Sequence, residues 1–254
     1  QARKSIVVTD SFKRRLIGKG AAPPSVSVVP NGVDLDRYYA SNESPPIDAL
    51  RRDDGCRIVG YLGNMGAGQG LSAVLRAAAQ LRDERPHIRF VLAGDGPERR
   101  SLEHLARELR LDNVMLHGAI PKDDTRAFYN SCDICLVPLA DVSVFQETVP
   151  SKIFEVMACE RPVLASVGGE AARIVRESRG GIVTPPGDSE GIANGVRQLL
   201  AQSEDKCAAM GSRARRYVTE HYERGMLARR YWNLLNEVVN EGHEATERYP
   251  SHVS

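Results

Sequence analysis

The sequence predicts an α/β fold: a Rossmann-like, doubly wound parallel sheet with helices on both faces. Two observations support this prediction. Short apolar runs recur along the chain without polar alternation, as expected of strands that are buried on both faces. Amphipathic stretches of helical length separate these runs, and such alternation of strands and helices is typical of a parallel sheet. With 254 residues and 42% hydrophobic content, the chain can also bury a full core.

Six strands are expected in the sheet, each an apolar run bounded by turn-forming residues. They are 57–62 (RIVGYL), 88–93 (IRFVLA), 114–117, 133–138, 162–166 and 181–184. A helix is expected after each of them, over 71–84, 97–109, 123–130, 151–159, 170–178 and 189–202.

The two ends of the chain are predicted to lie outside this unit, which is assigned to 55–222. Residues 1–32 read as strand, helix and strand, and we interpret them as the last piece of a preceding domain. Residues 33–54 form a hinge or linker, because much of this segment is rich in Pro, Ser, Asp and Asn and lacks periodicity. A C-terminal helix is expected over 223–240 and a polar, disordered tail over 241–254.

Charge and composition exclude several classes of protein. Lys and Arg total 34 against 33 Asp and Glu, a net charge of +1, so no bulk field attracts nucleic acid. No apolar run approaches the length of about eighteen residues that a membrane span needs. The apolar stretch in the opening segment is too short for a secretory signal peptide.

The five cysteines are scattered and odd in number, which suits a reducing compartment better than a disulfide framework. Cys132 and Cys135 form a lone C-x-x-C at the entry to a predicted strand. Because no second pair completes a zinc site, we interpret them as small buried thiols.

Two glycine-rich segments follow predicted strands. Gly63–Gly70 (GNMGAGQG) would let a ligand approach the backbone, and the helix after it favours phosphate. Its spacing matches neither the G-x-G-x-x-G of dinucleotide folds nor a P-loop, so a tight turn explains it equally well. In Gly94–Gly96 (GDG) the following Pro97 opens a helix, and we interpret that segment as structural.

The most informative segment is 145–155 (FQETVPSKIFE). Ser151 is predicted to cap a helix, and the ammonium of Lys152 beside the positive helix end favours a diphosphate. Glu155 shares a helix face with Lys152, where one carboxylate can accept two hydrogen bonds from a ribose diol. Glu147 precedes the helix and can reach another part of the same elongated ligand. The alternative is that Lys152 and Glu155 form a solvated surface pair of little energetic value.

Glu147 and Glu155 together form an E-x7-E pattern that resembles that of retaining group 1 glycosyltransferases, which have the two-domain GT-B fold. VVPNGVDLDRY resembles the hinge segment of that family, and VPSKIFEVMACERPVLAS resembles its E-A-M-A-x-G-x-P-V-I-A-S block. VLAGDGPERRSLE, NVMLHGAIPKDDTRAFYNSCDICLVPL and GEAARIVRESRGGIVTPPGD also match, in the same order. The likeness covers 1–240. It implies that the chain is the donor-binding half, that 1–32 is a remnant of the acceptor domain, and that 223–240 is the helix crossing back to it.

The resemblance also implies roles for individual residues. Glu155 would hold the ribose, and Glu147 and Lys152 would act at the donor sugar and diphosphate as catalytic residues. Transfer would retain the anomeric configuration, phosphate contacts would stabilise the leaving diphosphate, and no metal or cofactor is expected. The remaining nucleotide-sugar-binding residues would come from three loops: Gly63, Asn64, Gln69, Ile120, Thr148, Val149, Pro150 and Ser151.

One departure from the family's pattern concerns the diphosphate. Many members read G-R-x4-K-G in the glycine loop, where this chain has Asn64 and Gln69, so two charge-assisted contacts are absent. The sequence looks more like a bacterial subgroup that reads G-N-x4-Q-G. We expect Lys152 to supply the missing cation from the other side of the site.

The partners follow from the same resemblance. The donor would be a nucleotide-sugar, a UDP-sugar before a GDP-sugar, and the acceptor a glycan or lipid-linked saccharide held by the missing N-terminal domain. The subgroup is associated with capsule and O-antigen assembly, which implies a cytoplasmic enzyme, peripherally associated with the inner face of the cytoplasmic membrane. Little or no transfer is expected from this half alone, because catalysis needs the closed two-domain site.

Two other classes of protein stay open as alternatives. The first is a nicotinamide-dependent dehydrogenase, although its expected ribose-binding acids, Asp83 and Glu84, fall inside a helical pattern. The second is a non-catalytic nucleotide-binding or scaffold module, in which the arginines of 213–230 bind an anionic partner such as lipid headgroups. A solvated helix face is the plainer interpretation of those arginines.

Overall fold

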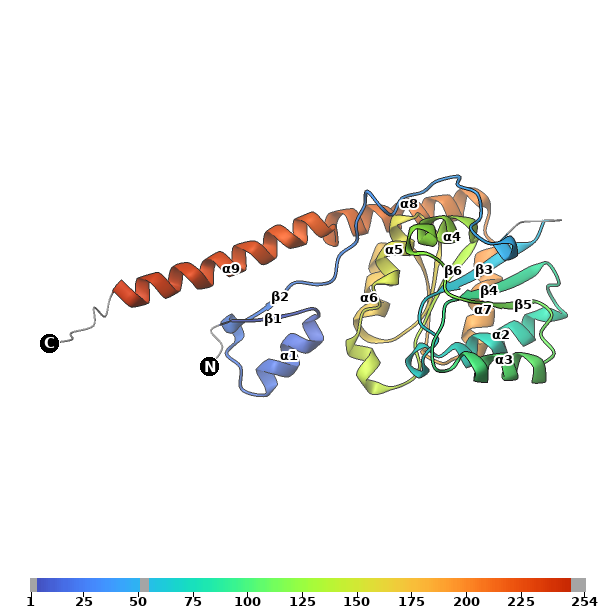
Figure 1. Ribbon diagram of the computed structural model, residues 1–254, viewed down its shortest axis with the longest axis horizontal. Helices are drawn as coiled ribbons and strands as arrows, with labels where there is room; N and C mark the ends of the chain where they lie inside the picture. The colour runs from blue at the N-terminus through green and yellow to red at the C-terminus, as the bar shows by residue number, and fades with distance from the viewer. Residues whose placement is uncertain (1–3, 51–54, 248–254) are drawn as a thin grey trace.

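The computed structural model describes residues 4–50 and 55–247 (Figure 1). Its main body is a six-stranded parallel sheet with the order β5-β4-β3-β6-β7-β8. The predicted α/β fold is confirmed, and β6 and β7 each begin one residue later than expected. The strands are β3 (Arg57–Leu62), β4 (Ile88–Ala93), β5 (Val114–His117), β6 (Ile134–Pro138), β7 (Val163–Ser166) and β8 (Gly181–Thr184).

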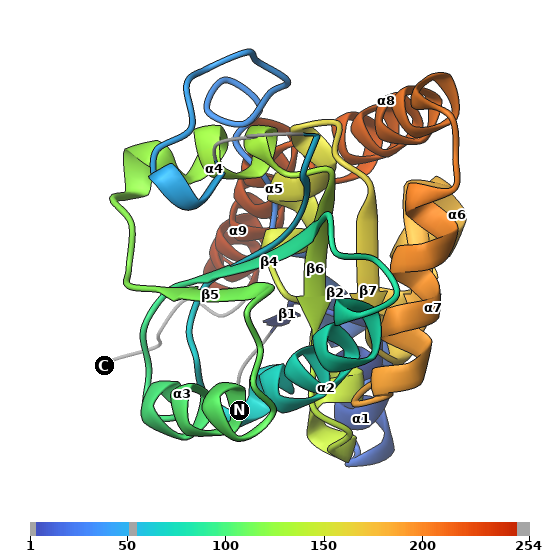
Figure 2. The ribbon, with the colours of Figure 1, turned by 90° about the vertical axis from the view of Figure 1, so that its right-hand side faces the viewer.

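Helices cover both faces of the sheet and enclose two apolar cores (Figure 2). One face packs against α2 (Leu71–Arg82), α3 (Arg99–Glu108) and α7 (Ser189–Leu200). The other face packs against α4 (Thr125–Ser131), α5 (Lys152–Ala158), α6 (Gly169–Ser178) and α8 (Glu204–His221). Burial on both sides explains why the strands are continuous apolar runs. Short 3₁₀ turns lie at Pro23–Ser25, Asp48–Leu50, Ala67–Gln69, Lys122–Asp124 and Ser143–Glu147.

The strand order places a topological switch point between β3 and β6. From β3 the chain moves outward through β4 to β5, and it then returns to the other side of β3 as β6. Loops that leave the carboxyl ends of β3 and β6 therefore run to opposite faces. In open α/β sheets this divergence creates the crevice in which ligands bind.

A small lobe precedes the main sheet. It consists of β1 (Ser5–Val7), α1 (Asp10–Gly18) and β2 (Val26–Val28), with β1 and β2 paired in parallel. The lobe lies beside α6 and under α9 (Figure 1). The chain passes between lobe and main body at Val33, whose backbone bonds to Tyr222 O (2.8 Å) and Arg224 N (3.0 Å).

The segment that the sequence marks as a hinge or linker packs against the main body over much of its length. Tyr38, Ala49 and Leu50 are buried in the core. Arg215 of α8 donates to the carbonyls of Tyr38 and, at 2.7 Å, of Ala158 at the end of α5. Isolated apolar residues in a polar stretch carry no periodic signal, so this packing was not predictable from pattern.

The last helix, α9, runs from Arg224 to Glu247. The sequence predicts a disordered tail from residue 241, and this was wrong for 241–247, which are helical. No proline lies between Arg224 and Pro250, so no proline ends the helix at residue 240. Residues 248–254 of the predicted tail lie outside the described residues. None of the helices in the described part of the chain has the length and apolar composition needed to cross a bilayer.

The C-x-x-C pair is buried at the junction of α4 and β6. Cys132 and Cys135 are both free thiols, and burial raises the pKa of Cys135 well above its ordinary value. A thiol in that condition resists ionisation, so the pair packs as small apolar side chains. Among the residues that the structure describes, no cluster of His, Cys, Asp or Glu could hold a metal ion.

Candidate functional site

The glycine loop and the β6–α5 connection meet at the carboxyl edge of the sheet, at the switch point. Ala140 N donates to Gly68 O (3.0 Å). A Cβ at Gly68 would lie 2.5 Å from the ring of Phe145. A side chain at position 68 would displace the Phe145 ring, so glycine there allows close packing between the two loops, which is the structural role that the sequence left open.

Lys152 points from the first turn of α5 toward the glycine loop. Its Nζ lies 4.0 Å from the centroid of the Tyr61 ring and 3.2 Å from Oε1 of Gln69. A Cβ at Gly63 would lie 2.8 Å from the same nitrogen, and Gly63 has φ +146°. The Lys152 ammonium thus lies beside the backbone of Gly63, the ring face of Tyr61 and the amide of Gln69. Its position over the ring is that of a cation–π contact.

Burial lowers the pKa of Lys152 to about 7, and the charge of Glu155 opposes that shift. Although part of the side chain reaches the surface, protein atoms surround the ammonium on most sides. Burial removes water from the ammonium and so disfavours its charged form. An anionic ligand bound beside it would compensate for that lost hydration, so the site favours an anion.

Glu155 lies one turn further along α5 and contacts a second helix. The hydroxyl of Tyr129 donates to Oε2 of Glu155 over 3.0 Å. Burial raises the pKa of Glu155, while the Tyr129 hydrogen bond and the Lys152 charge lower it. Lys152 and Glu155 are therefore not a solvated surface pair, and that alternative was wrong.

Glu147 faces the small lobe. Its Oε2 accepts from Nη1 of Arg15 on α1 over 3.1 Å. Thr148 and Val149, which follow it, line a cavity of about 70 Å³ between the lobe and α6, together with Phe12. Glu147 thus lies before α5 and faces the lobe, whereas Glu155 lies within α5 and faces α4.

The remaining predicted residues surround this loop. Ser151 directly precedes α5, but its side chain makes no capping hydrogen bond, so that part of the prediction was wrong. Its backbone already has helical angles, whereas a capping residue is extended. Pro150 accepts a hydrogen bond from Ile153 N at 3.1 Å. Asn64 accepts a 2.6 Å hydrogen bond on its carbonyl from Tyr61. Ile120 follows β5 at the same edge of the sheet and packs against the core.

Three residues that the sequence analysis missed contact the predicted ones: Tyr61, Tyr129 and Arg15. The two tyrosines lie within a predicted strand and a predicted helix, and no pattern around them indicated a role in the site. A signal did exist, because a buried tyrosine needs a partner for its hydroxyl. No local pattern relates Arg15 to Glu147, which is 132 residues away.

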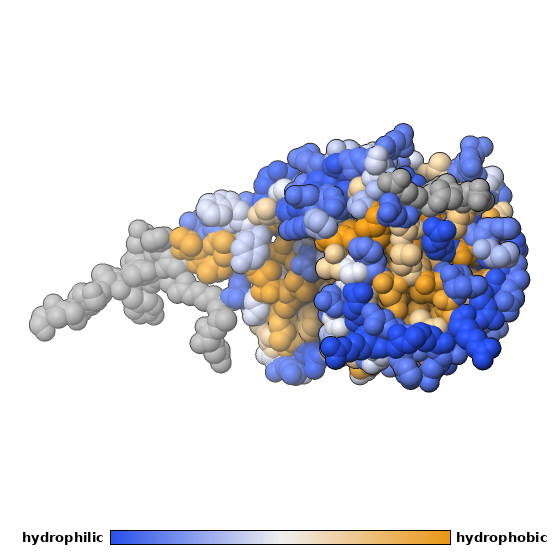
Figure 3. Space-filling model, turned by 45° about the vertical axis from the view of Figure 1, so that its right-hand side comes forward, coloured by the Kyte–Doolittle hydropathy of each residue, from blue (hydrophilic) through white to orange (hydrophobic). Residues whose placement is uncertain are grey.

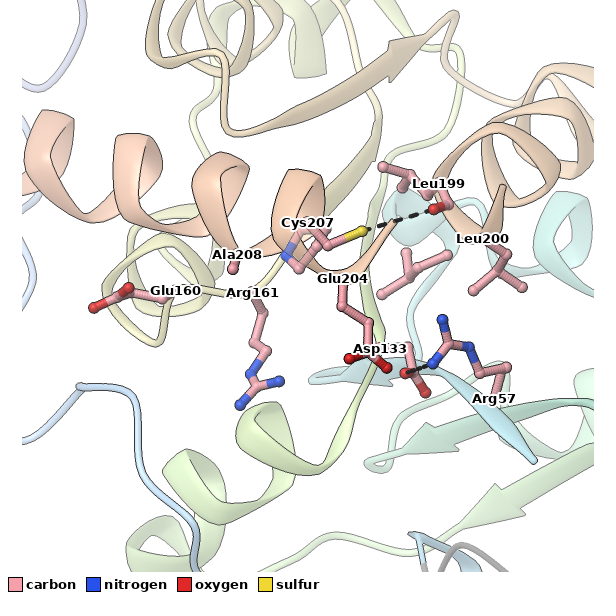
Figure 4. A pocket seen from close by; sticks show the side chains of 11 residues that line it. Arg57, Asp133, Glu160, Arg161, Leu199, Leu200, Glu204, Cys207 and Ala208 are labelled. Carbon is pink, nitrogen blue, oxygen red and sulfur yellow. Dashed lines mark hydrogen bonds and ion pairs between the residues drawn. The ribbon is translucent and has the colours of Figure 1, made fainter. Parts of the chain in front are cut away.

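Another pocket, of about 240 Å³, lies at the amino ends of β3, β6 and β7 (Figure 4). Apolar side chains of α7 and α8 form one wall, and the ion pair of Arg57 with Asp133 (3.2 Å) closes one side. This edge is opposite the switch-point loops. Because ligands of doubly wound sheets bind at the carboxyl edge, we place the functional site at the switch point.

The structure bears on both alternative functions. Asp83 and Glu84 follow the C-terminus of α2, at the amino edge of the sheet, where they pair with Arg82 and Arg197. A dehydrogenase needs its ribose-binding acid at the carboxyl edge. Several arginines of 213–230 are also used internally, for example Arg215, which bonds to backbone carbonyls. Neither alternative gains support.

The fold and the position of this site define a doubly wound α/β protein with a candidate ligand site at the carboxyl edge of its sheet. The chain matches the family "Glycosyl transferases group 1" over residues 47–217. It belongs to this family. A curated relative, the putative colanic acid biosynthesis glycosyltransferase WcaL of Salmonella typhimurium, is 23% identical over 91% of this chain and 56% of its own length. The 2-deoxystreptamine glucosyltransferase of Streptomyces kanamyceticus is 28% identical over 71% and 46%. The chain thus spans about half the length of these relatives.

Solved structures share the fold. Sucrose-phosphate synthase of Thermosynechococcus elongatus aligns with a TM-score of 0.77 and 25% identity, over 93% of this chain and 58% of that one. HepE of Anabaena, in complex with UDP and glucose, aligns with a TM-score of 0.78 and 23% identity, over 92% and 63%. The chain therefore has the fold of the aligned part of these GT-B structures.

Proposed function

We propose that the switch-point site binds a nucleotide-sugar, a UDP-sugar by preference, as the donor of a retaining glycosyltransferase. Glu155 would accept hydrogen bonds from the ribose diol, and Lys152 would bind the diphosphate from above the glycine loop. Glu147 would lie at the donor sugar, with Thr148 to Ser151 along the sugar and distal phosphate. The base would lie against Ile120.

The observation that carries this proposal is the arrangement of Lys152 and Glu155. One cation and one carboxylate lie a helical turn apart on α5, and both have pKa values shifted by burial. Such shifts at the mouth of a switch-point crevice are typical of functional residues. Lys152 would supply the cation that the Arg and Lys of the glycine loop supply in other members, and its contact with Gln69 of that loop supports this role. The UDP held by HepE supports the choice of base.

The acceptor belongs to the part of the enzyme that this chain does not span. In the face shown in Figure 3, hydrophobic residues gather over the small lobe and the adjoining part of α9. Tyr231, Trp232, Leu235 and Val239 of α9 are all exposed. We propose that residues 1–32 and α9 complete a second domain that covers this surface and binds a glycan or lipid-linked acceptor. We place this reaction in surface-polysaccharide assembly at the inner face of the cytoplasmic membrane; the relative named for colanic acid biosynthesis supports the polysaccharide part of this proposal.

The test is calorimetric titration of the chain with UDP, GDP, ADP and NAD, repeated with Glu155→Ala. Saturable binding of one nucleoside diphosphate is expected, weakened about tenfold in the variant because the ribose loses a charge-assisted acceptor. Binding of NAD instead would overturn the proposal in favour of a dehydrogenase. Equal affinity of the chain and of the Glu155→Ala variant would show that the nucleotide binds elsewhere.

Glu204→Ala is the matched control for this titration. Glu204 lies at the exposed start of α8 and lines the pocket at the amino edge. The substitution removes one carboxylate, as Glu155→Ala does, but at the opposite edge of the sheet. Its nucleotide affinity should therefore equal that of the unchanged chain. A loss of affinity in Glu204→Ala would move the site to the pocket of Figure 4.

A further inference from the structure

The Tyr129–Glu155 hydrogen bond joins α4 to α5. Tyr129 is 3% exposed, and its hydroxyl bonds to one carboxylate oxygen, Oε2, at 3.0 Å. The other oxygen, Oε1, accepts no hydrogen bond from residues 4–50 or 55–247. One oxygen of the carboxylate is therefore held by Tyr129, and the other has no hydrogen-bond donor among the described residues.

The ring of Tyr129 is itself firmly placed. It packs edge-on against Phe128, with the centroids 6.1 Å apart, and lies 6.5 Å from the ring of Tyr38. Neither contact involves the hydroxyl. Replacement by phenylalanine would therefore remove the hydrogen bond and keep the packing.

Charged and titratable groups from every surrounding element face Glu155. They are Lys152 on α5, Cys159 directly after it, Tyr129 on α4, Arg37 and Tyr38 in the segment after the small lobe, and Arg224 on α9. Among the groups that favour the ionised carboxylate, Tyr129 has the largest effect and is the only one that acts through a hydrogen bond. Lys152, Arg37 and Arg224 act on the carboxylate as charges at a distance, and such charges do not orient it.

We propose that Tyr129 is a positioning residue for nucleotide recognition: its hydroxyl fixes Oε2 of Glu155 so that Oε1 faces the ribose diol. This inference rests on the proposed function, in which Glu155 binds the ribose. A merely structural role would be satisfaction of a buried hydroxyl, and that role would affect all ligands alike. Under the positioning role, loss of the hydroxyl weakens only ligands that carry the ribose diol. Under a structural role, it weakens all ligands equally.

The experiment compares two ligands on the Tyr129→Phe variant. UDP carries the ribose diol, and 2′,3′-dideoxyuridine diphosphate lacks it. UDP affinity should fall about fivefold, as for a lost hydrogen bond to a charged group. The affinity for the dideoxy compound should stay within about twofold, because that ligand makes no use of Glu155. If GDP proves to be the ligand, the guanosine pair takes the place of the uridine pair.

The pH dependence gives a second readout. The ionised form of Glu155 accepts the diol, so UDP affinity is lost as the pH falls through the Glu155 pKa. Removal of the Tyr129 hydroxyl raises that pKa further. The loss should consequently begin at higher pH in Tyr129→Phe than in the unchanged chain. An unchanged pH profile would overturn the positioning role.

Tyr217→Phe is the matched control. Its hydroxyl also donates to a glutamate, Oε2 of Glu177, over 2.7 Å, between α8 and α6. UDP affinity should be unchanged by this substitution. In a double-mutant cycle, Tyr129→Phe should have no effect on UDP affinity once Glu155 is alanine.

The outcomes separate the two proposals. If Glu155→Ala weakens UDP binding and Tyr129→Phe does not, the positioning role is wrong and the proposed function stands. If Tyr129→Phe weakens UDP and the dideoxy compound equally, the role is structural. If Glu155→Ala has no effect on UDP, the proposed function fails.

Discussion

Substitution of Lys152 by alanine is expected to weaken nucleoside diphosphate binding about thirtyfold or more. The ammonium is the cation that the glycine loop itself lacks, and it is enclosed by Tyr61 and Gln69. A contact between a buried ammonium and a diphosphate is charge-assisted and little screened by solvent. Calorimetry with UDP measures the effect. Affinity within about twofold of the unchanged chain would show that Lys152 does not compensate for the missing Arg and Lys.

Lys206→Ala provides the comparison, since Lys206 is an exposed lysine on α8. It removes the same charge from the chain without touching the site. Its UDP affinity should be unchanged at physiological ionic strength, because exposed charges beyond about 8 Å are screened.

The titration of Lys152 also predicts a pH dependence of binding. Its pKa lies at about 7 in the free chain, and a bound diphosphate favours the protonated form. Above that pH, binding must take up a proton, so affinity should fall by up to about tenfold per pH unit. The Lys152→Ala variant should lack this decline. A decline of equal size in the variant would assign it to another group.

Burial of Lys152 also lowers the free energy of unfolding of the chain. Its pKa is lowered from 10.5 to about 7 on folding. Between these pH values the unfolded chain binds a proton that the folded chain does not, so stability rises with pH across this window. Lys152→Met should therefore stabilise the free chain by about 1–3 kcal/mol at neutral pH and flatten that rise. Urea unfolding at several pH values measures both effects, and a less stable Met variant would contradict them.

Substitution of Gly94 by alanine should destabilise the fold by about 4 kcal/mol or prevent folding. Gly94 has φ +144°, and a Cβ there would lie 1.8 Å from the carbonyl oxygen of Gly63. That carbonyl belongs to a backbone that cannot move freely, because Gly63 N donates to Ala93 O at 3.0 Å. Neither loop can retreat without loss of a hydrogen bond at the sheet edge. Urea denaturation gives the free energy of unfolding.

Gly18→Ala is the control for this prediction. Gly18 is the last residue of α1, and a Cβ there would meet no heavy atom within 4 Å. The substitution should be neutral or stabilise by up to about 1 kcal/mol, because alanine favours helix. A Gly94→Ala protein as stable as Gly18→Ala would mean that the two loops approach less closely than the structure describes.

The fold was largely predictable from sequence because burial of a parallel sheet leaves a simple trace. A strand covered on both faces must be apolar throughout, and turn residues bound it, as in Arg57–Leu62. Strand order leaves no such trace in one sequence. The helix α9 was misjudged beyond residue 240 because polar composition alone does not end a helix.

Within the candidate site, only the residues on α5 and in the segment that leads into it were predictable from sequence. Lys152 and Glu155 share a helix face, and helical spacing makes that readable. Tyr61, Tyr129 and Arg15 approach them from other elements, and contacts at long sequence separation depend on strand order. The glycine loop was ambiguous for a physical reason, since it accommodates both the ammonium at Gly63 and ordinary packing at Gly68.

The contacts of Arg215 determine where the chain can bend. Its guanidinium bonds both to the carbonyl of Tyr38 and to the carbonyl that ends α5. The stretch after Val33 and the helix that carries Lys152 and Glu155 are therefore fastened into one rigid body. Val33 is itself held by hydrogen bonds to Tyr222 and Arg224, so a rotation of the small lobe would be absorbed upstream of it, between β2 and Val33. A pivot placed there would swing Arg15 toward or away from Glu147 while the spacing of Lys152 and Glu155 stays constant. Lobe movement then changes access to one end of the site and leaves the geometry of the other end intact.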